Sequence, residues 1–188
     1  MVYSLSMAVV GEPMVGKTAI CKKMCLGEFT DKYLPTTCSE LFKTGQFYNG
    51  DNYHIKLWDI SGNPRFQYKR KEYLSGSAGI FIVCDLTRDR GFASCANWLY
   101  EIESVCPDAV AIILANKADL QTNQIPTKFN QYTVIKTSAV WPSLSLENLL
   151  ERMLSEIMNS STRSSVFVHN KGYLSFSNTN SQAKCTLM

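Results

Sequence analysis

The chain has 188 residues, 45% of them hydrophobic, which fits one domain of roughly 150–160 residues with a short extension. The longest apolar runs, 78–84 and 109–115, are far shorter than the ~20 residues that cross a bilayer. The start lacks the basic region of a signal peptide. These features exclude a multidomain machine and a membrane-spanning protein, and we expect a chain that stays in the cytosol.

Charge and cysteine content argue against further classes of protein. Of the 19 basic residues, three lie from position 160 onward, so the remaining 16 face 16 acidic residues in the body. A neutral body gives no support for a nucleic-acid-binding face. Seven cysteines without a Cys-x-x-Cys pair, together with only two histidines, argue against a zinc site or a disulfide framework.

Strand-like and helix-like patterns alternate along the chain. Apolar strand-like runs occupy 5–10, 41–48, 53–59, 79–85, 110–115 and 132–137, and helical periodicity occupies 17–26, 92–105 and 146–158. Asn49-Gly50-Asp51 reads as a hairpin turn. The pattern predicts an α/β fold, a mostly parallel six-stranded sheet with one antiparallel edge strand and helices on both faces. We expect a domain over residues 1–159 and a disordered Ser/Asn/Thr-rich tail over 160–188.

The segment after the first strand carries a phosphate-binding motif. Gly11 to Thr18, GEPMVGKT, matches G-x-x-x-x-G-K-[ST] and lies between a strand and a helix. Backbone N–H groups at the helix start would bind phosphate oxygens. Lys17 would neutralise the terminal phosphates, and the Thr18 hydroxyl would bind Mg²⁺. The motif predicts a P-loop NTPase.

Two later segments contain residues that could recognise the base of a bound nucleotide. Asn116-Lys117-Ala118-Asp119 follows the fifth strand-like run, and Thr137-Ser138-Ala139 follows the sixth. The Asp119 carboxylate can accept two hydrogen bonds from N1–H and the exocyclic amine of guanine, which adenine cannot provide. The Lys117 stem can lie over the base, and a backbone N–H of the later segment can bind the guanine carbonyl oxygen. These features favour GTP or GDP over adenine nucleotides, and so oppose a P-loop kinase or ATPase.

The P-loop, Asp59-x-x-Gly62, Asn116-Lys117-x-Asp119 and Thr137-Ser138-Ala139 occur in an order and spacing that resembles the Ras-superfamily GTPases over residues 3 to 158. Arg65-Phe66, Tyr73 with Gly76, and Asn97-Trp98-Leu99-x-x-Ile102 look most like the Rab family. The resemblance implies a monomeric GTP/GDP switch with Mg²⁺, which acts in vesicle traffic. Exchange factors, GTPase-activating proteins and effectors would bind its switch regions.

The resemblance also assigns roles to single residues. Phe29 corresponds to the aromatic residue against guanine, Thr36 to the threonine that reaches Mg²⁺ and the γ-phosphate, and Asp59 to the residue that holds Mg²⁺ through water. The metal set is Thr18, Thr36 and Asp59. The implied nucleotide-binding residues are Pro13, Met14, Val15, Gly16, Lys17, Thr18, Ala19, Phe29, Tyr33, Thr36, Gly62, Asn116, Lys117, Asp119, Ser138 and Ala139.

The implied catalytic set is Lys17, Thr36 and Asn63, and Asn63 departs from the family pattern. The family orients the attacking water with a glutamine at this position. Because asparagine is one methylene shorter, we expect slow intrinsic hydrolysis. Pro64 stiffens the loop, and Pro13 and Met14 replace small residues of the P-loop. The alternatives are a pseudo-GTPase that serves as a GTP-bound scaffold, and an ordinary timed switch that tolerates these changes.

Two further departures concern the connection before the sixth strand and the effector segment. Only 15 residues separate Leu120 from Lys136, so the helix usual there must be short or absent. In the effector segment, Thr37 and Cys38 replace the usual residues, while Phe42 is interpreted as its aromatic end.

The last four residues, 185–188, match C-a-a-X and predict prenylation of Cys185. The single lipid implies reversible binding to the cytosolic face of intracellular membranes, with cycling to the cytoplasm. Because Rabs more often end with two modifiable cysteines, the tail leaves a Ras- or Rho-like signalling GTPase open.

Overall fold

The computed structural model describes residues 1–32, 34–88, 90–120, 122–140 and 144–160. Its centre is a six-stranded sheet with the order β2-β3-β1-β4-β5-β6. The strands are β1 (Val2–Val10), β2 (Ser39–Tyr48), β3 (Asp51–Ile60), β4 (Gly79–Asp85), β5 (Val110–Asn116) and β6 (Thr133–Lys136). Every neighbouring pair is parallel except β2 with β3. The predicted sheet, with its antiparallel edge strand, is confirmed.

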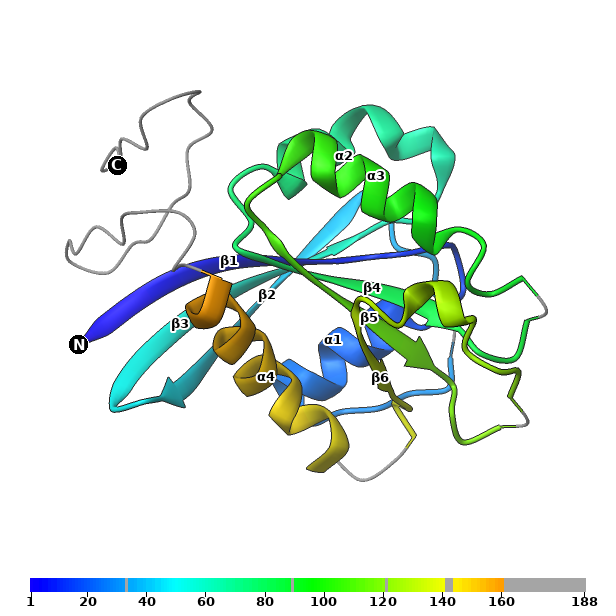
Figure 1. Ribbon diagram of the computed structural model, residues 1–188. Coiled ribbons are helices and arrows are strands. Elements are labelled where there is room, and N and C mark those ends of the chain that lie inside the picture. Colours follow the sequence, from blue (N-terminus) through cyan, green and yellow to red (C-terminus); the bar gives the residue numbers. More distant parts are fainter. Residues whose placement is uncertain (33, 89, 121, 141–143, 161–188) are drawn as a thin grey trace.

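Helices cover both faces of the sheet, two on each (Figure 1). They are α1 (Lys17–Leu26), α2 (Gln67–Leu74), α3 (Cys95–Val105) and α4 (Leu144–Ser160). One hydrophobic cluster joins the sheet to α1 and α4, and a second joins its other face to α2 and α3. Among the described residues, no helix has the length and apolarity needed to span a membrane.

The turn predicted at Asn49-Gly50 joins β2 to β3. Tyr48 pairs directly with Asp51, so two residues form the loop. Asn49 has φ 48° and Gly50 has φ 86°, the left-handed conformations that a type I′ hairpin turn requires and that Asn-Gly provides at low cost. This turn fixes the register of the hairpin and therefore which side chains share each face.

Some elements differ from the predictions. The sequence patterns missed α2, because QYKRKEYL is too polar for a helical apolar stripe to be visible. The helix predicted from residue 92 starts at Cys95. In the described residues between β5 and β6, the only helical element is the 3₁₀ turn η2 (Thr127–Phe129), which agrees with the shortened connection.

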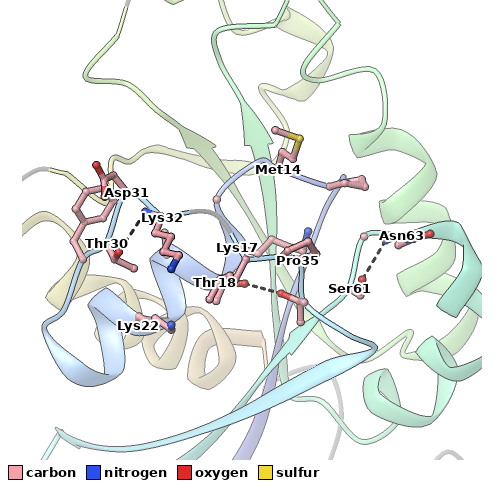
Figure 2. A pocket seen from close by; sticks show the side chains of 17 residues that line it. Met14, Lys17, Thr18, Lys22, Thr30, Asp31, Lys32, Pro35, Ser61 and Asn63 are labelled. Atoms are coloured by element: carbon pink, nitrogen blue, oxygen red, sulfur yellow. Dashed lines mark hydrogen bonds between the residues drawn. The ribbon is translucent and has the colours of Figure 1, made fainter.

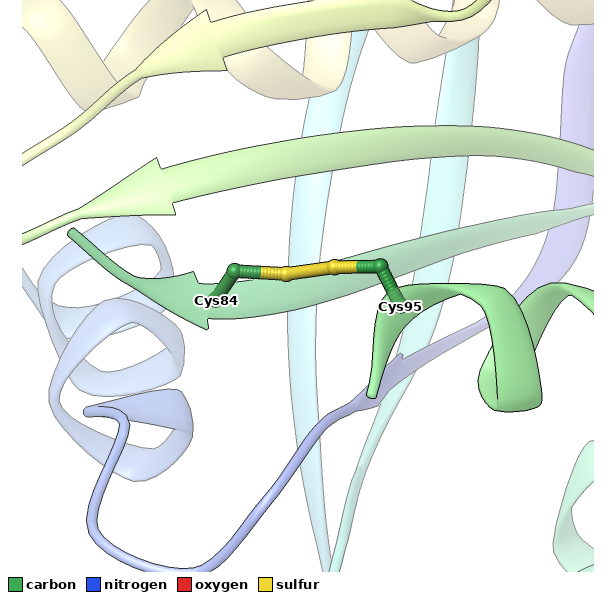
Figure 3. Close-up of a disulfide and its surroundings, with 2 residues drawn as sticks. All are labelled: Cys84 and Cys95. Atoms are coloured by element: carbon green, nitrogen blue, oxygen red, sulfur yellow. A yellow bond between two sulfur atoms is a disulfide. The ribbon is translucent and has the colours of Figure 1, made fainter. Parts of the chain in front are cut away.

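The cysteine interpretation needs a correction. Cys84, near the end of β4, and Cys95, at the start of α3, form a disulfide with their Cα atoms 7.0 Å apart (Figure 3). Both residues are buried in the cluster beneath α2 and α3. Composition and spacing could not reveal this pair, because the strand-to-helix connection brings the two cysteines together only in the folded chain.

Candidate functional site

The P-loop connects the carboxyl end of β1 to α1. Gly16 has φ 97°, and a Cβ added there would lie 2.4 Å from Asn116 Nδ2, so only glycine fits. The buried Lys17 side chain folds back over the loop, and its Nζ donates to the carbonyl oxygens of Gly11 (3.0 Å) and Glu12 (2.8 Å). Burial lowers the pKa of Lys17 to about 8, although the charge of Asp59 opposes the shift.

Three oxygen-bearing side chains from different segments meet beside the P-loop. Thr18 comes from α1, Thr36 from the segment before β2, and Asp59 from β3. The Thr18 and Thr36 hydroxyls are 2.8 Å apart, and both reach Asp59 Oδ2, Thr18 at 2.5 Å and Thr36 at 3.3 Å. The structure therefore brings together all three residues of the expected metal set.

This cluster fits a divalent cation. Asp59 is fully buried, and its second carboxylate oxygen, Oδ1, has no hydrogen-bond partner among the described residues. Burial raises the pKa of Asp59, against the hydrogen bonds from both threonines and the charge of Lys17. A cation at Asp59 and an anionic phosphate at Lys17 would each favour the charged form of its neighbour. Hydroxyl and carboxylate oxygens are the donors that Mg²⁺ prefers.

Gly62 brings the loop after β3 against the P-loop. A Cβ on Gly62 would lie 2.3 Å from the Gly11 oxygen and 2.7 Å from the Pro13 nitrogen, so no larger residue can approach as closely. Ser61 and Gly62 are buried. The backbone of this loop thus forms one wall of the pocket.

Asn63 follows Gly62, and its side chain is engaged in a local contact. Asn63 Oδ1 accepts a hydrogen bond of 3.0 Å from the Arg65 backbone N–H, which caps the 3₁₀ turn η1 (Pro64–Phe66). In Figure 2 Asn63 lies beyond Ser61 and extends away from Lys17 and Thr18. The sequence drew attention to the length of this side chain; the structure adds that its amide oxygen already has a partner.

Arg70, in α2, was missed by the sequence reasoning. Its buried guanidinium donates to the Gly62 carbonyl oxygen at 3.1 Å, lies 3.4 Å from Glu101 Oε2 and packs 4.4 Å from the centre of the Trp98 ring. These contacts tie the loop at Gly62 to α3. No short motif contains this arginine, and only the helical position of residue 70 could have drawn attention to it.

The pocket formed by these segments encloses about 340 Å³. The predicted residues that line it are Pro13, Met14, Gly16, Lys17, Thr18, Ala19, Phe29, Thr36, Gly62 and Asn63. The buried Val15 side chain does not line it, and Tyr33 lies outside the described residues. Two further lysines, Lys22 and Lys32, line the side away from Asn63 (Figure 2). Three lysines against one lining aspartate, Asp31, give the pocket a cationic character suited to phosphates.

The base-recognition segments lie at the carboxyl ends of β5 and β6. Asn116 Nδ2 donates to the Val15 carbonyl oxygen at 2.8 Å and thereby fastens this region to the P-loop. Asp119 accepts a 2.5 Å hydrogen bond from Ser138 Oγ, and Ala139 is buried beside it. These residues do not line the pocket described above, but the Asn116 contact places both regions at the same edge of the sheet.

Lys117 has φ 62° and extends toward Asp85 at the end of β4, with Nζ 2.7 Å from Oδ2. Burial would raise the pKa of Asp85, but hydrogen bonds from Lys117 and Thr87 outweigh it and lower the pKa below the usual value. The sequence analysis did not identify Asp85, whose only signal was its place at the end of a buried strand. The ion pair holds the Lys117 stem at the site.

The effector segment needs one correction. Phe42 is only 7% exposed and belongs to the core between the sheet and α1 and α4. Leu41, 37% exposed, occupies the outer face instead, and it pairs across the strands with Trp58. The Trp58 ring lies 5.2 Å from the Tyr73 ring of α2. The outer apolar surface at this point of β2 is therefore formed by Leu41, one residue before Phe42, which the sequence analysis interprets as the end of the effector segment.

Comparison with known proteins places these features in a family. Residues 6–164 match the model of the Ras family. Ras-related protein Rab-21 of Dictyostelium discoideum is 28% identical over 185 residues, which cover 97% of this chain and 86% of that protein. Rab-11C of the same organism is 26% identical over 164 residues, covering 82% and 73%. For human Rab-21 the match, 28% identical over 120 residues, spans 63% of this chain and 53% of the relative. The match to the family model extends over most of the sequence and includes every motif of the site, so the chain belongs to the Ras family of small GTPases, within which it is Rab-like.

Proposed function

We propose that this chain is a guanine-nucleotide-dependent switch that hydrolyses GTP slowly and acts in intracellular membrane traffic. The observation that carries the proposal is the meeting of Lys17, Thr18, Thr36 and Asp59 at one cationic pocket. The proposed role in membrane traffic rests on the similarity of this chain to proteins named Rab. Exchange factors, GTPase-activating proteins and effectors are its expected partners, and the chain acts as a monomer.

The binding chemistry follows from the residues of the site. Lys17 neutralises the terminal phosphates, and Phe29 packs against the base. Asp119 accepts hydrogen bonds from the guanine edge, next to Ser138 and Ala139. Thr18, Thr36 and Asp59 would hold Mg²⁺, which when bound neutralises charge on the phosphates.

The switching step uses Thr36 and Gly62. Thr36 lies on the segment that precedes β2, and its hydroxyl hydrogen-bonds with Thr18 and Asp59. In the GTP state Thr36 and the Gly62 N–H both bind the γ-phosphate side of the site. Loss of this phosphate releases both segments, and the order change is what partners recognise.

The slow rate is proposed from the contact of Asn63 with Arg65. An amide that caps its own 3₁₀ turn is not directed at a water beside the γ-phosphate. The same observation favours the second candidate, a pseudo-GTPase that holds GTP as an interaction scaffold. Both candidates require guanine nucleotide, and they differ only in whether turnover occurs.

Bound-nucleotide analysis followed by single-turnover hydrolysis tests the proposal. The full chain is purified with Mg²⁺, its bound base is identified by chromatography, and the conversion of loaded GTP to GDP is followed over time. Guanine nucleotide with slow conversion is the expected result. Adenine nucleotide would refute the assignment, and complete absence of conversion would select the scaffold.

Cys185 lies outside the described residues, and we propose that it is prenylated and anchors the chain reversibly to cytosolic membrane faces. The intact mass of the protein made in a eukaryotic host tests this part. A mass increase at Cys185 is expected, and an unmodified cysteine would contradict it.

A further inference from the structure

The outer face of the β2–β3 hairpin is not covered by a helix over most of its length. On the side of α2 and α3, the cross-strand pairs run in the order Leu41–Trp58, Lys43–Lys56, Gly45–His54 and Phe47–Asn52. The Trp58–Tyr73 contact brings α2 against the first pair. In the next three pairs every residue is exposed except Lys56, which is half-buried. These six residues form what we call the hairpin face.

Charge is separated between the two faces of the hairpin. Because side chains alternate along a strand, the acidic residues Glu40, Asp51 and Asp59 all belong to the side of α1 and α4. Burial together with the charge of Asp51 raises the pKa of Tyr53, a core residue of that side. The hairpin face carries two lysines and one histidine and no carboxylate from either strand.

Two features suit this face to an anionic surface. Lys43 and Lys56 lie directly opposite each other and place two positive charges at one point of the face. Phe47 is 64% exposed, and the register Val2–Asn52–Phe47 places a second apolar residue, Val2, 49% exposed, on the same side. Cationic and aromatic side chains on one surface are the composition that binds the headgroup region of an anionic bilayer.

The position of the hairpin face agrees with such a contact. In Figure 1 the last turn of α4 lies beside the first half of β1, toward the end of the molecule where the β2–β3 hairpin turns. The nucleotide site lies at the other end, after the carboxyl end of β1.

We propose that the hairpin face is a contact site for an anionic lipid bilayer. Lys43 and Lys56 bind the headgroups, and Phe47 inserts between them. Phe47 is six residues, roughly 20 Å, from Leu41 along β2, so a membrane at the hairpin end leaves the surface of Leu41, Trp58 and Tyr73 accessible to protein partners. This site goes beyond the proposed nucleotide switch, and it requires no modification of Cys185.

Vesicle sedimentation tests the proposal. The full chain, produced in bacteria and unmodified at Cys185, is mixed with phosphatidylcholine vesicles with and without phosphatidylserine. We compare Lys43→Glu and Phe47→Ser with matched controls at other exposed positions, Lys136→Glu in β6 and Tyr100→Ser in α3. Lys43→Glu places a carboxylate opposite Lys56, so it should fold at least as well as the parent. Nucleotide binding by each variant checks the fold.

The parent is expected to bind the anionic vesicles, more weakly as salt rises, and the neutral ones hardly at all. Removal of one lysine charge should weaken binding about fivefold and its reversal more, and Phe47→Ser should weaken it roughly five- to tenfold, while both controls match the parent. The proposal is wrong if the parent does not bind anionic vesicles even at millimolar lipid, or if Lys43→Glu behaves like Lys136→Glu.

An acidic protein partner is the rival occupant of the hairpin face. It would be indicated, and the membrane proposal overturned, if Lys43→Glu left vesicle binding unchanged but impaired the chain in cells. Failure of the nucleotide switch is a separate result: a chain that binds anionic vesicles but no guanine nucleotide would refute the proposed function alone.

Discussion

Substitution of Asn63 by glutamine separates two effects of this residue, the capping of η1 and the positioning of the attacking water. In the native chain Asn63 Oδ1 accepts a 3.0 Å hydrogen bond from Arg65 and caps η1. Glutamine is one methylene longer, so its amide cannot close the same cap but can extend toward the phosphate side of the pocket that residue 63 lines. Stability and hydrolysis should therefore change in opposite directions.

The magnitudes follow from these two contacts. Loss of an exposed cap costs about 1 kcal/mol in the free energy of unfolding, which lowers the Tm of a domain of this size by about 2–4 °C. A shift of ~1 Å in a positioning group changes rates on the order of a hundredfold, so Asn63→Gln should accelerate hydrolysis by roughly tenfold to a hundredfold.

Single-turnover hydrolysis of Mg²⁺·GTP, with the Tm of the same samples, provides the assay. Asn63→Ala is the matched control, because it removes the cap without providing an amide. It should show the same lowering of Tm and no acceleration. Equal rates for the native chain, Asn63→Gln and Asn63→Ala would refute the reasoning and mean that another group positions the water.

Three further perturbations test the site and the fold. Gly62→Ala places a Cβ 2.3 Å from a P-loop oxygen, and the resulting overpacking should cost about 1–3 kcal/mol. The release of a fluorescent guanine nucleotide should therefore become about tenfold faster or more. An unchanged release rate would contradict the close approach of Gly62 to the P-loop. Because the folded-state pKa of Asp85 is lowered, its contribution to stability is present above about pH 4 and disappears as pH falls through the folded pKa. Urea unfolding of Asp85→Asn should therefore show a deficit near neutral pH that shrinks on acidification, and a constant deficit would be the contrary result. Reduction of Cys84–Cys95 opens a short loop and should lower the free energy of unfolding by about 3 kcal/mol on the chain-entropy model. Thiol titration of the unreduced, denatured chain, made in bacteria so that Cys185 is unmodified, should find five of the seven cysteines reactive. Seven reactive thiols would show that the disulfide does not form.

Much of the fold and part of the site could be predicted because their signals are local in the sequence. The turn at Asn49-Gly50 needs only two residues with positive φ, and the P-loop is a contiguous run between a strand and a helix. The order of the motifs along the chain was enough to place Thr18, Thr36 and Asp59 in one expected set, which the structure then brings within hydrogen-bonding distance.

The features that were missed depend on register and on contacts between distant segments. Phe42 and Leu41 are adjacent in an apolar run, and only the pairing with β3 decides which one faces the core. Arg70 is one basic residue in a polar helix, and its role appears only when Trp98, Glu101 and the Gly62 carbonyl surround it. The identity of Asn63 was visible in the sequence, but its capping contact required the turn at Pro64.

The proposed slow hydrolysis and the proposed switch are compatible, because different residues would carry them. The proposed order change would depend on Thr36 and Gly62, and neither residue contacts the Asn63 amide in the hydrogen bonds described above. Arg70 anchors the loop on the far side of Gly62 to α3, which would limit how far that loop moves when the γ-phosphate is lost. A chain built in this way would leave the GTP state mainly when an activating partner repositions the loop at Asn63. Its timing would then be set by that partner rather than by its own turnover.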